Sequence, residues 1–115
     1  MSNFDGKFWN TLDRLVQASE IVIDRPKGSA HPKYPSLVYP ADYGYLKNTA
    51  SMDGGGIDLW LGEGEPAVTA VLCTVDLLKR DCEIKILLGC TEEELAAILK
   101  TQNRTPNMAA LLIRR

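Results

Sequence analysis

Two aspartates and three glycines in the middle of the chain have the spacing of a cation-binding loop. Asp53 and Asp58 bracket Gly54, Gly55 and Gly56 in the segment DGGGID. Glycine readily adopts positive φ, so such a bend can direct both carboxylates at one hard cation. The segment lacks the alternating Asp or Asn and the distal Glu of an EF-hand loop. A hairpin turn with both carboxylates in solvent therefore remains the alternative.

Lysines and tyrosines near this segment carry the groups that bind phosphate. All four tyrosines lie between residues 34 and 45, and Tyr39 and Tyr43 bracket a proline that can direct their hydroxyls into a cleft. Lys85 alternates with apolar residues in a predicted strand, so its ammonium is not an ordinary surface charge. Taken singly, the other candidates are assigned to ordinary positions: Lys27, Lys33, Lys47 and His31 to the surface, and Tyr34 and Tyr45 to packing.

Length and charge exclude several classes of protein. The chain has 115 residues and a formal net charge of -2, which predicts one domain over residues 1–115 and argues against nucleic acid or an anionic membrane as a partner. Acidic residues interrupt the N-terminal segment, which has no signal-peptide core, and no apolar run approaches the ~20 residues of a membrane span. Cys73, Cys82 and Cys90 lack CxxC spacing and are predicted to be buried reduced thiols, so we expect a cytoplasmic protein.

The N-terminal half predicts a helix followed by short strands. Residues 6–18 read as an amphipathic helix with Asp5 as its N-cap. Its apolar stripe is formed by Phe8, Leu12, Leu15 and Val16, with Trp9 at the border. Residues 20–24 form a short strand that ends before Pro26, and residues 37–39 and 43–46 form short extended pieces.

Hydrophobic alternation predicts strands at 57–61, 67–79 and 82–89. In the first of these, Ile57, Leu59 and Leu61 face one core, and Asp58 points away from it. Residues 81, 83 and 85 place three charged side chains on one face of the last strand, which requires that face to be solvated. A capping box at Thr91 predicts a helix over residues 92–102. Residues 108–115 are compatible with helix or strand, and we favour a strand.

Four sequence blocks together resemble a known family. VIDRPKGSAHPKY, YPADYGYL, DGGGIDLWL and EIK are similar to the blocks E-I-P-K-G-S…K-Y-E, Y-P-x-N-Y-G-F/Y, D-G-D-P-x-D and D-x-K of the first family of soluble, magnesium-dependent inorganic pyrophosphatases. The resemblance covers about residues 21–88, and the spacing inside each block is the same. The joined tyrosine and aspartate blocks make it specific.

This resemblance implies a fold and a site. The fold would be mainly β: an OB-like five-stranded barrel or twisted antiparallel sheet with an N-terminal and a C-terminal helix. Asp58, Tyr43 and Lys85 would be catalytic. The resemblance implies the remaining roles as follows: Mg²⁺ ligands Asp53, Asp58 and Glu83, with Asp24 where the family has the Glu of E-I-P; phosphate contacts Lys33, Lys85 and Tyr43, with Lys27 and Tyr39 lining the cleft. The charged strand face would then be the wall of that cleft.

The chain departs from the pattern at several positions. Gly55 replaces the middle aspartate of D-G-D-P-x-D, Pro35 replaces the Glu of K-Y-E, and the segment that carries a phosphate-binding Arg is shortened and has none. The first aspartate of the D…D-x-K pair falls on Leu78, and Asp76 or Asp81 would have to stand in for it. Asp42 replaces an Asn and is a further candidate metal ligand.

Two functions follow from this balance of matches and losses. The first is magnesium-dependent hydrolysis of pyrophosphate or a related phosphoanhydride at a reduced rate. The alternative is a degenerate relative that binds a phosphorylated ligand or a protein partner without hydrolysis. Neither function involves nucleic acid or a membrane, and the resemblance also implies self-association into a homo-oligomer.

Overall fold

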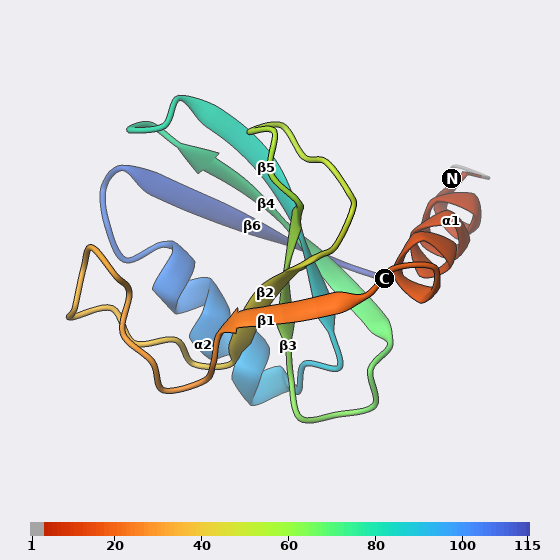
Figure 1. Cartoon of the computed structure of the whole chain (residues 1–115), viewed down its shortest axis with the longest axis horizontal. Coiled ribbons are helices and arrows are strands. Elements are labelled where there is room, and N and C mark those ends of the chain that lie inside the picture. The colour runs from red at the N-terminus through yellow and green to blue at the C-terminus, as the bar shows by residue number, and fades with distance from the viewer. Residues whose placement is uncertain (1–3) are drawn as a thin grey trace.

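The strands form one curled, mixed sheet (Figure 1) in the computed structural model, which describes residues 4–115. Within those residues, six strands follow the order β1-β2-β3-β5-β4-β6, so β1 and β6 are the edges. Their bounds are Ile21–Arg25 (β1), Asp42–Leu46 (β2), Ile57–Leu61 (β3), Val68–Asp76 (β4), Asp81–Leu88 (β5) and Met108–Arg114 (β6). Only β3 and β5 pair in parallel. The predicted mainly-β class is confirmed, in its twisted-sheet form and with a sixth strand.

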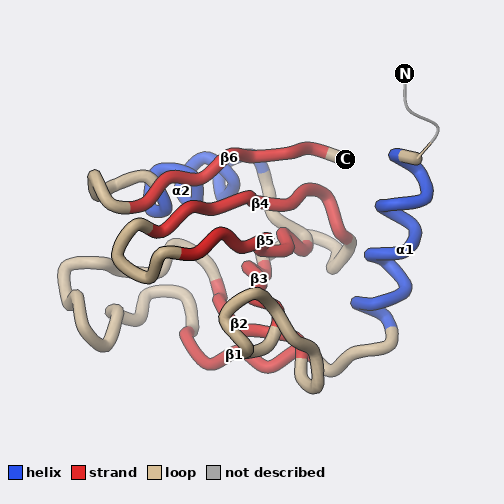
Figure 2. The backbone as a smooth tube through the Cα atoms, turned by 90° about the horizontal axis from the view of Figure 1, so that it is seen from above, coloured by secondary structure: helices blue, strands red, loops and turns tan. Residues whose placement is uncertain are grey.

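The two helices cover opposite faces of the sheet. Helix α2 (Glu92–Gln102) begins with the predicted capping box, in which Thr91 accepts from the backbone of Glu94 and Glu94 accepts from the backbone of Thr91. It buries Leu95 and Ile98 in the cluster that contains Trp60. Helix α1 (Asp5–Gln17) lies on the other face, at the end of the molecule near the C-terminus (Figure 2).

The buried face of α1 differs from the predicted one. Trp9, Leu12 and Val16 pack against the second apolar cluster, whereas Phe8 is 46% exposed and Leu15 is 38% exposed. The predicted stripe was therefore wrong at Phe8 and Leu15. The helix is rotated so that the large indole ring of Trp9 packs against the sheet together with Leu12 and Val16. The N-cap prediction was also wrong, since Phe4 occupies the N-cap position, without a side-chain capping bond, and Asp5 is the first residue of the helix.

Both faces of the central strands are buried. In β3, Leu59 belongs to the cluster under α1 and Trp60 to the cluster under α2, so the expectation of a single core face was wrong. The prediction that the charged face of β5 is solvated was also wrong, because Glu83 and Lys85 are 7% and 5% exposed. A buried pair of charges in a central strand needs partners, and these form the site described below.

Most predicted boundaries hold within a few residues. The strand predicted to reach residue 79 ends at Asp76, because residues 77–80 form the turn of the β4–β5 hairpin, with Arg80 at φ 57°. The C-terminal segment is a strand, as favoured. All three cysteines are free, but of the predicted buried thiols only Cys90 is buried, whereas Cys73 is half-buried and Cys82 is exposed. Among residues 4–115, no helix is long and apolar enough to cross a lipid bilayer.

Gly44 allows the edge strand β1 to lie close to β2. A Cβ atom at this position would overlap the carbonyl oxygen of Val22. Gly44→Ala should therefore push β1 away and lower the free energy of unfolding by at least about 2 kcal/mol, measured by urea denaturation. Gly6→Ala is the matched control, because nothing lies within 4 Å of its added Cβ and alanine favours the helix by up to about 1 kcal/mol. Equal stability of the two variants would contradict this account.

Candidate functional site

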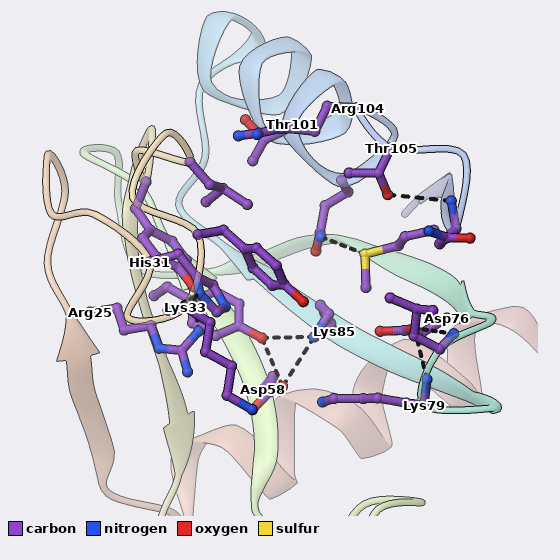
Figure 3. A pocket seen from close by; sticks show the side chains of 18 of the residues that line it. Arg25, His31, Lys33, Asp58, Asp76, Lys79, Lys85, Thr101, Arg104 and Thr105 are labelled. Atoms are coloured by element: carbon purple, nitrogen blue, oxygen red, sulfur yellow. Dashed lines mark hydrogen bonds and ion pairs between the residues drawn. The ribbon is translucent and has the colours of Figure 1, made fainter.

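A buried ammonium group lies at the centre of the candidate site. Lys85 Nζ contacts the hydroxyl of Tyr43 at 2.7 Å, Oδ2 of Asp58 at 3.0 Å and Oε2 of Glu83 at 3.2 Å. The Tyr43 hydroxyl in turn donates to the same oxygen of Asp58 at 2.7 Å. An ammonium has three N–H donors, so all three have partners in this arrangement. Figure 3 shows the contact between Lys85 and Asp58.

Three adjacent strands supply these side chains. Tyr43 lies on β2, Asp58 on β3, and Glu83 and Lys85 on β5. The order β2-β3-β5 places these strands side by side, and residues two apart on a strand point to the same face. The sheet therefore brings together four of the residues that the sequence predicted.

Burial shifts the acid–base properties of two members of this network. The pKa of Tyr43 is raised well above its usual value of 10.0, chiefly by burial and then by the negative charge of Asp58. Tyr43 therefore keeps its proton at neutral pH and acts as a hydrogen-bond donor. The pKa of Glu83 is also raised, because burial outweighs the opposing effect of Lys85.

A second group of carboxylates adjoins this network. Asp53, Asp81 and Glu83 each offer an oxygen, and these atoms lie within 4.8 Å of one another. Asp53 comes from the loop between β2 and β3, where its Oδ1 accepts from the backbone N–H of Gly55 at 2.9 Å and from Ser51 at 2.8 Å. These bonds, the Gly55 N–H foremost, lower the pKa of Asp53 to about 2.

This carboxylate trio fits a divalent cation. Glu83 Oε1 is buried and has no hydrogen-bond partner among residues 4–115, whereas its Oε2 is bonded to Lys85. A buried carboxylate oxygen without a donor is costly, and a hard cation held by oxygen ligands would satisfy it. Asp76 and Asp81 were the two candidates to replace the missing first aspartate of the D…D-x-K pair, and only Asp81 belongs to the trio. Asp76 instead accepts the backbone N–H groups of Leu78 and Lys79 in the hairpin turn.

A cleft of about 950 Å³ opens over the network. Its charged lining includes four acidic and five basic side chains: Asp24, Asp53, Asp58 and Asp76, and Arg25, Lys33, Lys79, Lys85 and Arg104. His31, predicted to be a surface residue, also lines this cleft and is only partly exposed, and burial lowers its pKa.

Arg25 reaches the cleft because of a β-bulge. The register runs from Ile23 opposite Gly44 to Arg25 opposite Tyr43, so Asp24 is an extra residue. Such a bulge interrupts the alternation of faces, and as a result both Asp24 and Arg25 line the cleft. The Arg25 guanidinium lies 5.6 Å from the centre of the Tyr39 ring and donates to the Tyr39 hydroxyl.

The predicted site residues divide into two groups. Glu83 of the network does not line the cleft, whereas seven of the others do: Asp24, Lys33, Tyr39, Tyr43, Asp53, Asp58 and Lys85. Lys27 and Asp42 do not line it. The Lys27 ammonium pairs with Glu63 at 3.1 Å, and Asp42 Oδ1 accepts the backbone N–H of Lys27 at 2.8 Å. Asp42 is thus engaged outside the cleft and away from the carboxylate trio.

Sequence reasoning missed three cations of the cleft: Arg25, Lys79 and Arg104. Strict alternation places Arg25 on the face opposite Asp24, and only the bulge changes this. Lys79 was assigned to the end of a strand, but it belongs to the hairpin turn. Arg104 lies in the loop before β6, outside residues 21–88, where no motif indicated that it approaches the site.

Solved structures of inorganic pyrophosphatases have the same fold. An inorganic pyrophosphatase from Neisseria gonorrhoeae matches with a TM-score of 0.67 and 17% identity, over 82% of this chain and 80% of that one. The Helicobacter pylori enzyme matches with a TM-score of 0.57 and 16% identity, over 82% and 81% of the two chains. An inorganic phosphatase from Anaplasma phagocytophilum gives 0.56 and 15%, with the same coverage.

The sequence comparisons give a different result. No family model matches the chain, and no curated protein matches it either. The resemblance inferred from the short blocks is therefore confirmed at the level of the fold: the chain has the pyrophosphatase fold with a highly divergent sequence.

The pKa values of Asp53 and Glu83 should be shifted in opposite directions from their usual values. In the metal-free protein, the carboxyl ¹³C signal of Asp53 should have its midpoint near pH 2, below the usual 3.8, and that of Glu83 should lie above the usual 4.5. The stabilising contribution of Asp53 is then present above pH 3.8 and lost as the pH falls towards 2. A midpoint for Glu83 below 4.5 would contradict its burial.

Proposed function

We propose that this chain hydrolyses pyrophosphate or a related phosphoanhydride in a Mg²⁺-dependent reaction, at a rate reduced by the loss of one carboxylate. The observation that carries the proposal is the juxtaposition of a buried Lys85–Tyr43–Asp58 network with the trio Asp53, Asp81 and Glu83. One part suits phosphate oxygens, and the other suits the cation that accompanies them. Phosphoryl transfer uses both parts, because cations and hydrogen-bond donors neutralise the charge on the phosphate oxygens.

The trio would hold the cation, with Asp58 next to it in the Lys85 network. When bound, Mg²⁺ would neutralise phosphate charge and lower the pKa of a coordinated water. The protein's own groups then have distinct tasks. Lys85 places a positive charge beside the phosphate oxygens. To donate to one of them, its ammonium or the Tyr43 hydroxyl exchanges a hydrogen bond of the network for the new one. Asp58, which accepts from both, fixes their positions.

Arg25 supports the same function from the edge of the cleft. The family pattern has an apolar residue at this position and an Arg in a segment that this chain lacks. A guanidinium offers paired N–H groups that match two phosphate oxygens. Arg25 and Lys33 therefore are our candidates for the contacts that the missing segment would have supplied, and the ring of Tyr39 holds the Arg25 guanidinium in place.

A second candidate function is ligand binding without hydrolysis. It is favoured by Gly55, which brings no carboxylate to orient a water, and by the complete use of Asp58 Oδ2 within the network. Both functions predict binding of pyrophosphate with Mg²⁺, and only the first predicts release of orthophosphate.

Phosphate release from pyrophosphate tests the enzymatic proposal. We expect release that requires Mg²⁺ and stops with a chelator. Asp58→Asn should lower kcat at least about 100-fold, because it removes the charge that positions Lys85 and Tyr43. Asp5→Asn, an exposed change of the same kind in α1, is the control and should retain the wild-type rate. Release that is independent of Mg²⁺, or unaffected by Asp58→Asn, would contradict the proposal.

Restoring the missing carboxylate should raise activity. Gly55 is not among the glycines with positive φ, and an added Cβ would meet only the carboxyl group of Asp53, with Oδ1 at 3.3 Å. Gly55→Asp should therefore tighten Mg²⁺ binding about tenfold by calorimetry and increase phosphate release. Gly54→Asp, which adds the same charge at φ 85°, is the matched control and should give a smaller gain. If neither variant nor wild type releases phosphate, the binding function is favoured.

A further inference from the structure

The cleft is much larger than pyrophosphate requires. Its volume of about 950 Å³ lies near the upper limit of pockets that enclose drug-sized organic ligands. The Lys85 network and Asp53 lie towards one end. Thr101, Arg104 and Thr105 project from the opposite wall, which is formed by the end of α2 and the loop before β6 (Figure 3). That wall lies outside residues 21–88, the part of the sequence that resembles pyrophosphatases.

The far wall contains an unsatisfied amide. Gln102 Oε1 is buried and has no hydrogen-bond partner in residues 4–115, and Gln102 Nε2 donates only to the sulfur of Met108, at 3.3 Å. An unpaired buried acceptor is costly, and sulfur is a weak acceptor. The last torsion of a glutamine is broad, so a small rotation can offer both amide groups to a ligand in the cleft. A paired donor and acceptor is the arrangement that recognises the edge of a nucleobase.

Aromatic rings form another part of the lining. The rings of His31 and Tyr34 lie 5.0 Å apart, and those of His31 and Tyr39 are nearly parallel, 6.3 Å apart. All three line the cleft, and Tyr34, 53% exposed, is the most open of them, whereas Tyr39 is 5% exposed. Flat π faces bind bases by stacking, whereas pyrophosphate gains nothing from them. Arg104 donates to Ser36 at 3.0 Å and so ties the far wall to the loop that carries Tyr34.

We propose that the substrate of this site is a nucleoside di- or triphosphate, in preference to free pyrophosphate. The phosphates lie against Lys85, Lys33 and Arg25, and the base lies between the aromatic rings and Gln102. Water attacks the terminal phosphorus, the bond from that phosphorus to the bridging oxygen breaks, and orthophosphate, a nucleotide one phosphate shorter and a proton are released. This inference rests on the proposed phosphoanhydride chemistry and adds the substrate class.

The test compares kcat/KM for ATP, CTP and pyrophosphate at equal free Mg²⁺, together with calorimetric binding of a methylene-bridged, non-hydrolysable ATP analogue. We expect at least one nucleotide to exceed pyrophosphate about tenfold. Gln102→Leu should lower the nucleotide-to-pyrophosphate ratio at least about fivefold, because it removes the amide and keeps the volume. Arg25→Met should weaken both substrates alike and leave the ratio unchanged. Gln17→Leu, an exposed change of the same type on α1, is the matched control.

The outcomes separate this inference from the function on which it rests. Hydrolysis of pyrophosphate without binding of the ATP analogue would overturn the nucleotide proposal and leave the proposed function intact. Binding of the analogue that is lost in Gln102→Leu, without hydrolysis of any substrate, would support the nucleotide site and contradict the enzymatic function. If Gln102→Leu does not fold, Thr101→Val on the same wall replaces it, and an unchanged ratio in that variant would count against the proposal.

Discussion

The ammonium group of Lys85 couples the chemistry of the site to the register of the sheet. The residue is only 5% exposed, and the partners of its ammonium come from β2, β3 and β5. Burying a charge costs several kcal/mol unless opposite charges and acceptors replace the lost water. A slip of one residue in β2 or β3 would turn Tyr43 or Asp58 to the other face and leave the ammonium without them. The contacts of Lys85 therefore also disfavour wrong strand pairings.

Negative and positive side chains occupy different parts of the site. The trio Asp53, Asp81 and Glu83 concentrates negative charge at the β2–β3 loop and the start of β5. Arg25 and the lysines of the lining supply positive charge around the rest of the cleft. Between them, Lys85 and Asp58 form a pair that is neutral by itself. A phosphoanhydride with its cation would meet complementary charge at both ends, and Gly55 is where that complementarity is weakest.

Local patterns predicted the parts of the fold that depend on local physics. Hydrophobic alternation predicted β3, and the capping box predicted α2. The spaced motif blocks predicted the residues that meet at Lys85. The misses have non-local causes. Trp9 is buried because it packs against the apolar cluster of the sheet that contains Leu59. Arg104 reaches the cleft because β6, which follows it, pairs with β4. Neither contact leaves a signature in the surrounding sequence, because each depends on packing between segments far apart in the chain.

The bulge in β1 has a consequence for how such a site can change over evolutionary time. Because β1 is an edge strand with one partner, an insertion or deletion of a single residue there alters which side chains face the cleft without displacing any other strand. A substitution in β3 or β5 must instead satisfy neighbours on both sides. The edge is therefore the place where new ligand contacts can be acquired in one genetic step, while the buried centre of the sheet keeps its arrangement.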